Sequence, residues 1–241
     1  MKRRVLYIII CLLPITAMGQ RYNGGQNNPY VDEKRVHFGF SLGMNLMSFG
    51  VTDSEEEING EVYHARVSNL MPGFSVGFIT DVRLSRHLNL RCTPALHFGS
   101  RTLSYIAESG HEVHGSFGNG DKTDMLSMPI SVPLYLKWSA EREGNYRPYL
   151  IGGGGVSYNV SRDPERPVYL KGLDYFVEVG FGTDLYLEWF KLCPEIKYQI
   201  GFANILTPLE ERAELTEPDQ FYTRALRRLT SQMLTITFNF E

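Results

Sequence analysis

Apolar and polar residues alternate with a period of two along most of this chain. In the stretch EVGFGTDLYLEWFKLCPEIKYQIGF, residues 178–202, Val179 and Phe181 share one side of an extended chain and Glu178 lies on the other. Successive side chains of a β-strand point to opposite faces, so the alternation predicts strands with one apolar and one polar face. The stretch therefore predicts a hairpin with a large apolar face opposite carboxylates, a lysine and glycines.

Eight blocks show this alternation, and each is about 10 residues long or slightly longer, which is enough to cross a bilayer. The first is HFGFSLGMNLMSF and the last is MLTITFNFE. In the fifth, RPYLIGGGGVSYNV, the apolar residues change phase between Ile151 and Val156. A bulge among Gly152 to Gly155 would reconcile the two halves, and we expect one there.

Short and long connections alternate strictly between these blocks. SRH, SAEREGNY and EWF are short, and the others run to about 22, 20, 12 and 27 residues. A soluble barrel would place its large apolar side chains inside and would give connection length no reason to alternate. An outer-membrane barrel has an apolar lipid face, a polar lumen, short periplasmic turns and long external loops. The sequence thus predicts an all-β fold, an eight-stranded antiparallel transmembrane β-barrel with both termini periplasmic.

If the apolar faces meet lipid, nine charged residues point into the lumen. An eight-stranded barrel has an interior just wide enough for side chains to fill, so charges of opposite sign should pair there. The sequence predicts a plugged cylinder with an ion-pair network rather than a channel. The candidate members are Asp81, Arg83, Arg91, Arg101, Lys137, Glu178, Asp184, Glu195 and Lys197.

The first residues match a secretory signal peptide. KRR precedes the apolar run VLYIIICLLPI, and TAMG offers small residues before a cleavage at Gln20. We expect a signal peptide over 1–19, a polar periplasmic segment over 20–35 and the barrel over 36–241. Such a protein belongs in the outer membrane of a Gram-negative bacterium.

Composition and charge narrow the function classes only slightly. The 241 residues are 43% hydrophobic and 21% charged, as in ordinary globular proteins. Without the signal peptide, 21 basic residues face 27 acidic ones, which does not suggest a nucleic-acid binder. No other stretch approaches the roughly 18 to 20 apolar residues of a membrane helix, so membrane insertion has to be by strands.

Motifs that would suggest chemistry are weak. GFGTD and IGGGGV lie inside strand patterns and do not open a helix as nucleotide-binding loops do, so no cofactor is expected. HEVH, residues 111–114, departs from zinc-protease spacing and has no assignable third ligand, which favours a solvated loop. Ser104, Ser109, His111 or His114 could contribute to a hydrolase site at the external rim, a less favoured alternative.

The two cysteines of the mature chain are expected to be free thiols. By the alternation, Cys92 faces lipid and Cys193 faces the lumen. Their side chains therefore point in directions that a disulfide bond cannot join.

The last long connection contains a helix-like segment, LTEPDQFYTRALRRL, with Thr216 as a possible N-cap. Two interpretations are open: a helix that folds over the barrel rim, or a docking surface whose arginines also meet lipopolysaccharide phosphates. The candidate contact residues are Phe221, Arg224, Leu226, Arg227 and Arg228.

The segments HFGFSLGMNLMSF, MPISVPLYLKW, RPYLIGGGGVSYNV and LDYFVEVGFGTDLYLEWFKLCPEIKYQIGF resemble the PorT/SprT proteins of Bacteroidota. These are small outer-membrane barrels needed for type IX protein secretion and, in gliding relatives, for motility. The resemblance runs over nearly the whole mature chain. It implies a secretion context and offers no catalytic motif to carry over.

We therefore expect a non-enzymatic subunit of the type IX machinery that acts as a structural or interaction component. Its expected partners are outer-membrane lipid, lipopolysaccharide and other secretion proteins, with no nucleic acid, small-molecule substrate or cofactor. The alternatives are a generic eight-stranded barrel for envelope integrity or adhesion and, from another class, a membrane-embedded hydrolase.

Overall fold

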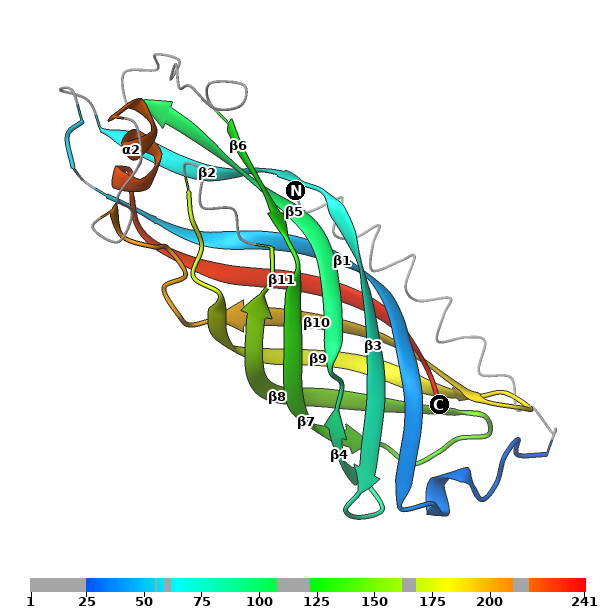
Figure 1. Ribbon diagram of the computed structural model, residues 1–241. Helices are drawn as coiled ribbons and strands as arrows, with labels where there is room; N and C mark the ends of the chain where they lie inside the picture. Colours follow the sequence, from blue (N-terminus) through cyan, green and yellow to red (C-terminus); the bar gives the residue numbers. More distant parts are fainter. Residues whose placement is uncertain (1–24, 55, 59–61, 108–121, 162–167, 210–216) are drawn as a thin grey trace, which may run out of the picture.

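The protein is a closed antiparallel β-barrel (Figure 1). The computed structural model describes residues 25–54, 56–58, 62–107, 122–161, 168–209 and 217–241. The signal peptide expected over 1–19 lies outside the described residues. The helices described are the 3-10 turn η1 (Val31–Glu33) and α2 (Glu217–Arg224). Neither has the length and apolar character needed to cross a bilayer.

Eleven strands form the sheet, and it closes because β1 pairs with both β11 and β3. Around the ring the order is β1, β11, β10, β9, β8, β7, the pair β4 and β5, then β3. These are eight positions, so the predicted eight-stranded barrel is confirmed. The strands are β1 (Val36–Asp53), β2 (Tyr63–Leu70), β3 (Pro72–Arg83), β4 (Leu88–Cys92), β5 (Ala95–Ala107), β6 (Lys122–Ser127), β7 (Pro129–Ser139), β8 (Tyr146–Asn159), β9 (Leu173–Tyr186), β10 (Lys191–Gly201) and β11 (Leu226–Phe240).

Eleven segments fill eight positions because three strands are interrupted. β2 leads into β3, β4 into β5 and β6 into β7, each after one or two unpaired residues. One interruption contains Pro94, which has no backbone N–H to contribute to the ladder but whose carbonyl accepts a bond of 3.0 Å from the Phe78 N–H. Pro94 thus interrupts the paired segment without opening the ring.

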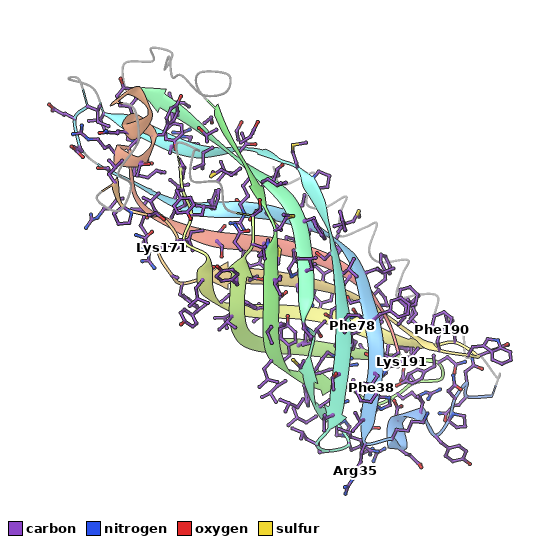
Figure 2. All side chains as sticks on the ribbon, in the orientation of Figure 1. Arg35, Phe38, Phe78, Lys171, Phe190 and Lys191 are labelled. Atoms are coloured by element: carbon purple, nitrogen blue, oxygen red, sulfur yellow. The ribbon has the colours of Figure 1, made fainter. Side chains whose placement is uncertain are left out.

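The apolar faces of the strands point outward. Along β7, buried and exposed residues alternate without a break, and the outward side chains from Ile130 to Trp138 are 44–57% exposed. Phe38 and Phe78, labelled in Figure 2, are each 72% exposed on the same outer surface. A soluble protein would bury such a continuous apolar surface, whereas a lipid bilayer covers it.

The bulge expected among Gly152 to Gly155 is absent, and that prediction is wrong. β8 pairs with β7 and β9 in an unbroken register through these glycines. Tyr149 and Ile151 point into the lumen, and Leu150 faces out. The apparent change of phase arose because two large side chains lie inside, where a tyrosine hydroxyl can find a polar partner.

The two ends of the barrel differ. The connections 84–87, 140–145 and 187–190 lie at the end that carries the C-terminus, called here the terminal end (Figure 1). At the opposite loop end, the connections 54–62, 108–121, 160–172 and 202–225 are longer. Several are shorter than expected, because β1 continues to Asp53 and β2, β5 and β6 extend the wall beyond the apolar band.

An apolar cluster fills the loop end, called here the loop-end cap. It joins residues of the extended strands β1, β2, β5, β6 and β11 to α2 and to residues near 168–170 and 205–206. Tyr105 and Tyr222 meet edge to face at its centre, with ring centroids 5.0 Å apart. The cap members are Phe49, Ile58, Ala65, Leu103, Tyr105, Met125, Val168, Leu170, Ile205, Leu206, Tyr222, Ala225, Leu226 and Leu229.

The predicted helix is shorter than expected. α2 ends at Arg224, and Arg227 and Arg228 lie on β11, where Thr52 of β1 stands opposite Arg228. The backbone of this segment completes the closing ladder of the barrel, and those hydrogen bonds outweigh a helical side-chain pattern of modest length. Thr216 lies outside the described residues.

We predict that the purified chain folds as a barrel in detergent, because its eight strand positions pair in a closed ring. Unheated protein should migrate differently from boiled protein on a denaturing gel, and its far-ultraviolet circular dichroism should show mainly strand. A predominantly helical spectrum would contradict the architecture.

Candidate functional site

The lumen is occupied by a network of charged side chains, and Arg91 of β4 stands at its centre. Its Nε lies 2.9 Å from Asp81, its Nη1 3.3 Å from Glu195 and its Nη2 2.5 Å from Glu241. Arg91 and all three carboxylates are buried, with side-chain exposures of 1%. One guanidinium thus satisfies acids from β3, from β10 and from the C-terminal residue.

These contacts cross the lumen. β4 and β10 are four positions apart on a ring of eight, so Arg91 and Glu195 belong to opposite walls. A barrel of this size leaves room for side chains only. Within the described residues, the bond from wall to wall blocks the lumen at this level.

A second set of ions continues the network toward the terminal end. Lys137 Nζ lies 2.8 Å from both carboxylate oxygens of Asp184, and Lys191 Nζ lies 2.6 Å from Glu241. Lys137 also stands 4.0 Å above the ring centroid of Tyr149. The cations of β7 and β10 therefore share acids with each other and, through Glu241, with Arg91.

Tyrosines connect the remaining ions. The Tyr149 hydroxyl donates to Glu195 at 2.8 Å, and the Tyr135 hydroxyl donates to Glu178. Lys197 reaches Glu195, its neighbour on the same face of β10, at 3.1 Å. Charge-assisted bonds of this kind satisfy the carboxylates that a dry interior would otherwise penalise.

A glycine sets the position of Tyr149. A Cβ at Gly182 would lie 2.6 Å from both the ring and the hydroxyl of that tyrosine, closer than real Cβ contacts come. Only glycine lets the ring lie against β9 and aim its hydroxyl at Glu195.

Seven of the nine predicted lumen residues meet in this network, and two do not. Arg83 lies at the terminal rim, where its Nη1 donates to the Asp32 carbonyl at 2.7 Å, and it forms no ion pair with another described residue. Arg101 is buried near the loop end and also has no ion pair there. The seven that meet are Asp81, Arg91, Lys137, Glu178, Asp184, Glu195 and Lys197.

Sequence reasoning missed Lys191 and Glu241, although a signal for both was present. Lys191 has the inward parity of Glu195 on β10, and Glu241 has that of Asn239 on β11. Extending the alternation by one step beyond the apolar residues would have included both. Lys191 directly follows the short connection EWF and Glu241 ends the last block, so both lie at strand ends, where alternation carries less weight.

The segment before β1 is tied across the terminal end. The Asp32 carboxylate accepts bonds of 2.8 and 2.9 Å from the Tyr186 hydroxyl. Arg142 stacks over the Tyr186 ring at 3.6 Å and donates to the Asn27 carbonyl at 2.5 Å. This segment covers the mouth of the network on the terminal side.

The predicted contact residues of the last connection are divided between surface and core. Arg224 pairs with Glu56, and Arg228 donates to the Phe202 carbonyl at 2.8 Å while remaining exposed. Arg227 is exposed. Leu226 is 5% exposed within the loop-end cap and cannot belong to an exposed contact surface. Phe221 lies in α2, and its side chain is outside the described part of the structure.

The arrangement closest to a hydrolase site is luminal. His97 lies between Ser75, 2.7 Å from its Nδ1, and Ser131, 2.9 Å from its Nε2. No described carboxylate contacts the ring, so nothing orients it as in a catalytic triad. Ser104 lies on β5, where its hydroxyl faces the Arg66 carbonyl. Ser109, His111 and His114 lie outside the described residues.

The described residues contain no group of three or more His, Cys, Asp or Glu that could hold a metal ion. Cys92 and Cys193 are both free. Cys193 is fully buried in the lumen, and Cys92 is partly exposed between the buried Arg91 and Thr93, so it faces outward. Their orientations are those that the alternation predicts.

Residues 24–207 match the sequence profile of the family described as "Outer membrane protein beta-barrel domain". The chain belongs to this family. It is an outer-membrane β-barrel protein. No curated protein matches the sequence.

Two solved structures align with this chain. The crystal structure of the outer membrane protein OprG from Pseudomonas aeruginosa aligns with a TM-score of 0.50 and 9% identity, over 90% of this chain and 96% of that one. The crystal structure of Neisserial surface protein A (NspA) aligns with a TM-score of 0.41 and 9% identity, over 86% of this chain and 98% of that one. At 9% identity the OprG likeness shows the barrel fold and nothing about activity.

We predict that Glu195→Ala destabilises the barrel by about 3 kcal/mol, because it leaves Arg91 and Lys197 under-compensated in a closed interior. Ile196→Ala, on the lipid face of the same strand, should cost clearly less. Urea titration of protein refolded in lipid vesicles measures both. A neutral Glu195→Ala beside a damaging Ile196→Ala would invert the assignment of faces.

We also predict negligible conductance, because Arg91 bridges opposite walls. Planar-bilayer recordings of the purified protein should show no stable open state. Large, long-lived channel currents would contradict the filled lumen.

Proposed function

We propose that this chain is a non-enzymatic structural and interaction subunit of the outer membrane, and that it serves type IX protein secretion. The non-enzymatic structural role is supported by the closure of the lumen by Arg91 and its three carboxylate partners. A barrel without a solute path has to act through its surfaces. The chemistry of the network around Arg91 supports the same view, because its acids are engaged with cations and tyrosines.

The orientation proposed for the barrel follows from its two ends. Outer-membrane barrels have short turns on the periplasmic side and long loops outside. The terminal end has the short connections, so both barrel termini would be periplasmic, and the loop-end cap would face the exterior.

The exposed arginines suggest how the outer end makes contacts. Arg227 and Arg228 project from β11 beyond the apolar band, and Arg224 lies beside them in α2. Guanidinium groups bind phosphates well, so this edge suits lipopolysaccharide or an acidic partner of the secretion machinery.

The secretion role rests on the resemblance of the sequence to PorT/SprT proteins. The second candidate is a general barrel for envelope integrity or adhesion. It is favoured by the family match, whose description names an outer-membrane barrel domain and no secretion system. Both candidates share the closed lumen, so only a cellular experiment separates them.

Deleting the gene should abolish release of type IX cargo proteins, and the wild-type gene should restore it. The measurement is cargo in the culture medium compared with cargo retained in cells. Complementation with Arg227→Glu should restore less secretion than Arg86→Glu, the same single change on an exposed turn at the terminal end.

Normal cargo release in the deletion strain, together with sensitivity to detergents or bile salts, would favour the general barrel and remove the secretion role. Immunoblots of outer-membrane fractions should show equal amounts of each variant.

A further inference from the structure

Arg101, on the inner face of β5, is a buried cation that forms no ion pair within 4.0 Å with a described residue. It is 5% exposed, its Nε has no hydrogen-bond partner, and none of its nitrogens donates to a described residue. Its guanidinium carbon lies 4.7 Å from the centroid of the Phe49 ring, in the loop-end cap. A guanidinium stays charged, and a buried charge without a partner costs several kcal/mol. Arg91, by contrast, has three carboxylates.

The nearest acid is engaged elsewhere. Asp174 of β9 lines the same cavity, but one of its oxygens accepts the Ala203 N–H at 3.2 Å and the other accepts the Ser231 hydroxyl. No ion pair within 4.0 Å joins it to Arg101 in the described structure. Those bonds hold Asp174 against the wall formed by β10 and β11, which leaves space in front of Arg101.

That space is a cavity with a mixed polar and apolar lining, between the loop-end cap and the ion network. Leu170 and Ile205 of the cap form part of its lining, and His97 and Gln199 lie among the polar residues. Lys171, labelled in Figure 2, is also among the lining residues, and it is exposed to solvent. The cavity measures about 30 Å³ on the scale on which one water needs about 10–15 Å³. It has room for a few atoms.

We propose that this cavity binds a small monovalent anion, a halide or the carboxylate group of a short organic acid, with Arg101 as its principal ligand. Arg101 is the buried cation of the lining, and the carboxylate of Asp174 is held by the Ala203 N–H and the Ser231 hydroxyl, which leaves the donors of Arg101 for a ligand. Arg101 presents a planar set of N–H donors with no acceptor, the arrangement that a carboxylate or halide satisfies.

Size and charge exclude a larger ligand. A phosphate would place a second negative charge beside Asp174 in a cavity of this volume. Lipopolysaccharide phosphates are therefore assigned to the exposed arginines of β11 and not to this site. The competing occupant is water alone, bridging Arg101 to Asp174.

The solution test uses the full mature chain refolded in lipid vesicles. Urea midpoints are measured in sodium bromide, acetate, phosphate and gluconate at equal ionic strength, with gluconate as the bulky reference. Bromide or acetate should raise the midpoint above the gluconate value, because a ligand of the folded state stabilises it. Arg101→Met should reduce this difference at least about fivefold, whereas Arg86→Met on the exposed turn should leave it unchanged.

Equal differences in wild type and Arg101→Met would overturn the proposal, and so would a phosphate effect as large as that of acetate. If Arg101→Met does not refold, anomalous diffraction from wild-type crystals grown in bromide distinguishes a bound bromide from water at the site. A bromide peak in contact with the Arg101 guanidinium supports the site, and water alone at that position refutes it.

Discussion

The packing of the barrel interior depends on one buried arginine, Arg91, whose carboxylate partners include one on the opposite wall of the lumen. Arg91 enters from β4, and its charge is stable in a closed interior only when carboxylates surround it. Glu195 on the opposite wall and Glu241 after β11 meet that need, together with Asp81 on the neighbouring strand. The pairing that satisfies the charge also joins distant strands and fills the space that a channel would require.

The two halves of the lumen are closed by different forces. Toward the terminal end, ions and tyrosines pair in a dense network, and the segment before β1 covers it. Toward the loop end, an apolar cap built on Tyr105, Tyr222 and the extended strands closes the barrel as an ordinary hydrophobic core. Between them lies the cavity that faces Arg101. Because the lumen is filled both by the ion network and by the loop-end cap, we expect the protein to act through its outer surfaces and not as a pore.

The two errors in the predicted elements had different causes, and each involved an apolar residue that is buried. Ile151 and Leu226 are apolar and buried, the first in the lumen and the second in the cap. The supposed bulge in β8 followed from the first, and the overlong helix followed from grouping Leu226 with α2. At Ile151 the packed lumen contains an apolar side chain where polar ones were expected, and at Leu226 the strand pairing of β11 with β1 outweighs the helical pattern.

Alternation with a period of two determined the barrel wall, its strand number and the inward direction of the charged residues, because strand geometry sends successive side chains to opposite faces. The inward direction of a side chain does not determine which charged groups lie close to it. Arg91 and Arg101 are both inward on consecutive strand segments, yet one meets three carboxylates and the other none. Only closure of the ring decides which residues meet, since Arg91 and Glu195 are 104 positions apart in the chain. The contacts across the lumen follow from the curvature and register of the whole sheet, which no local pattern contains.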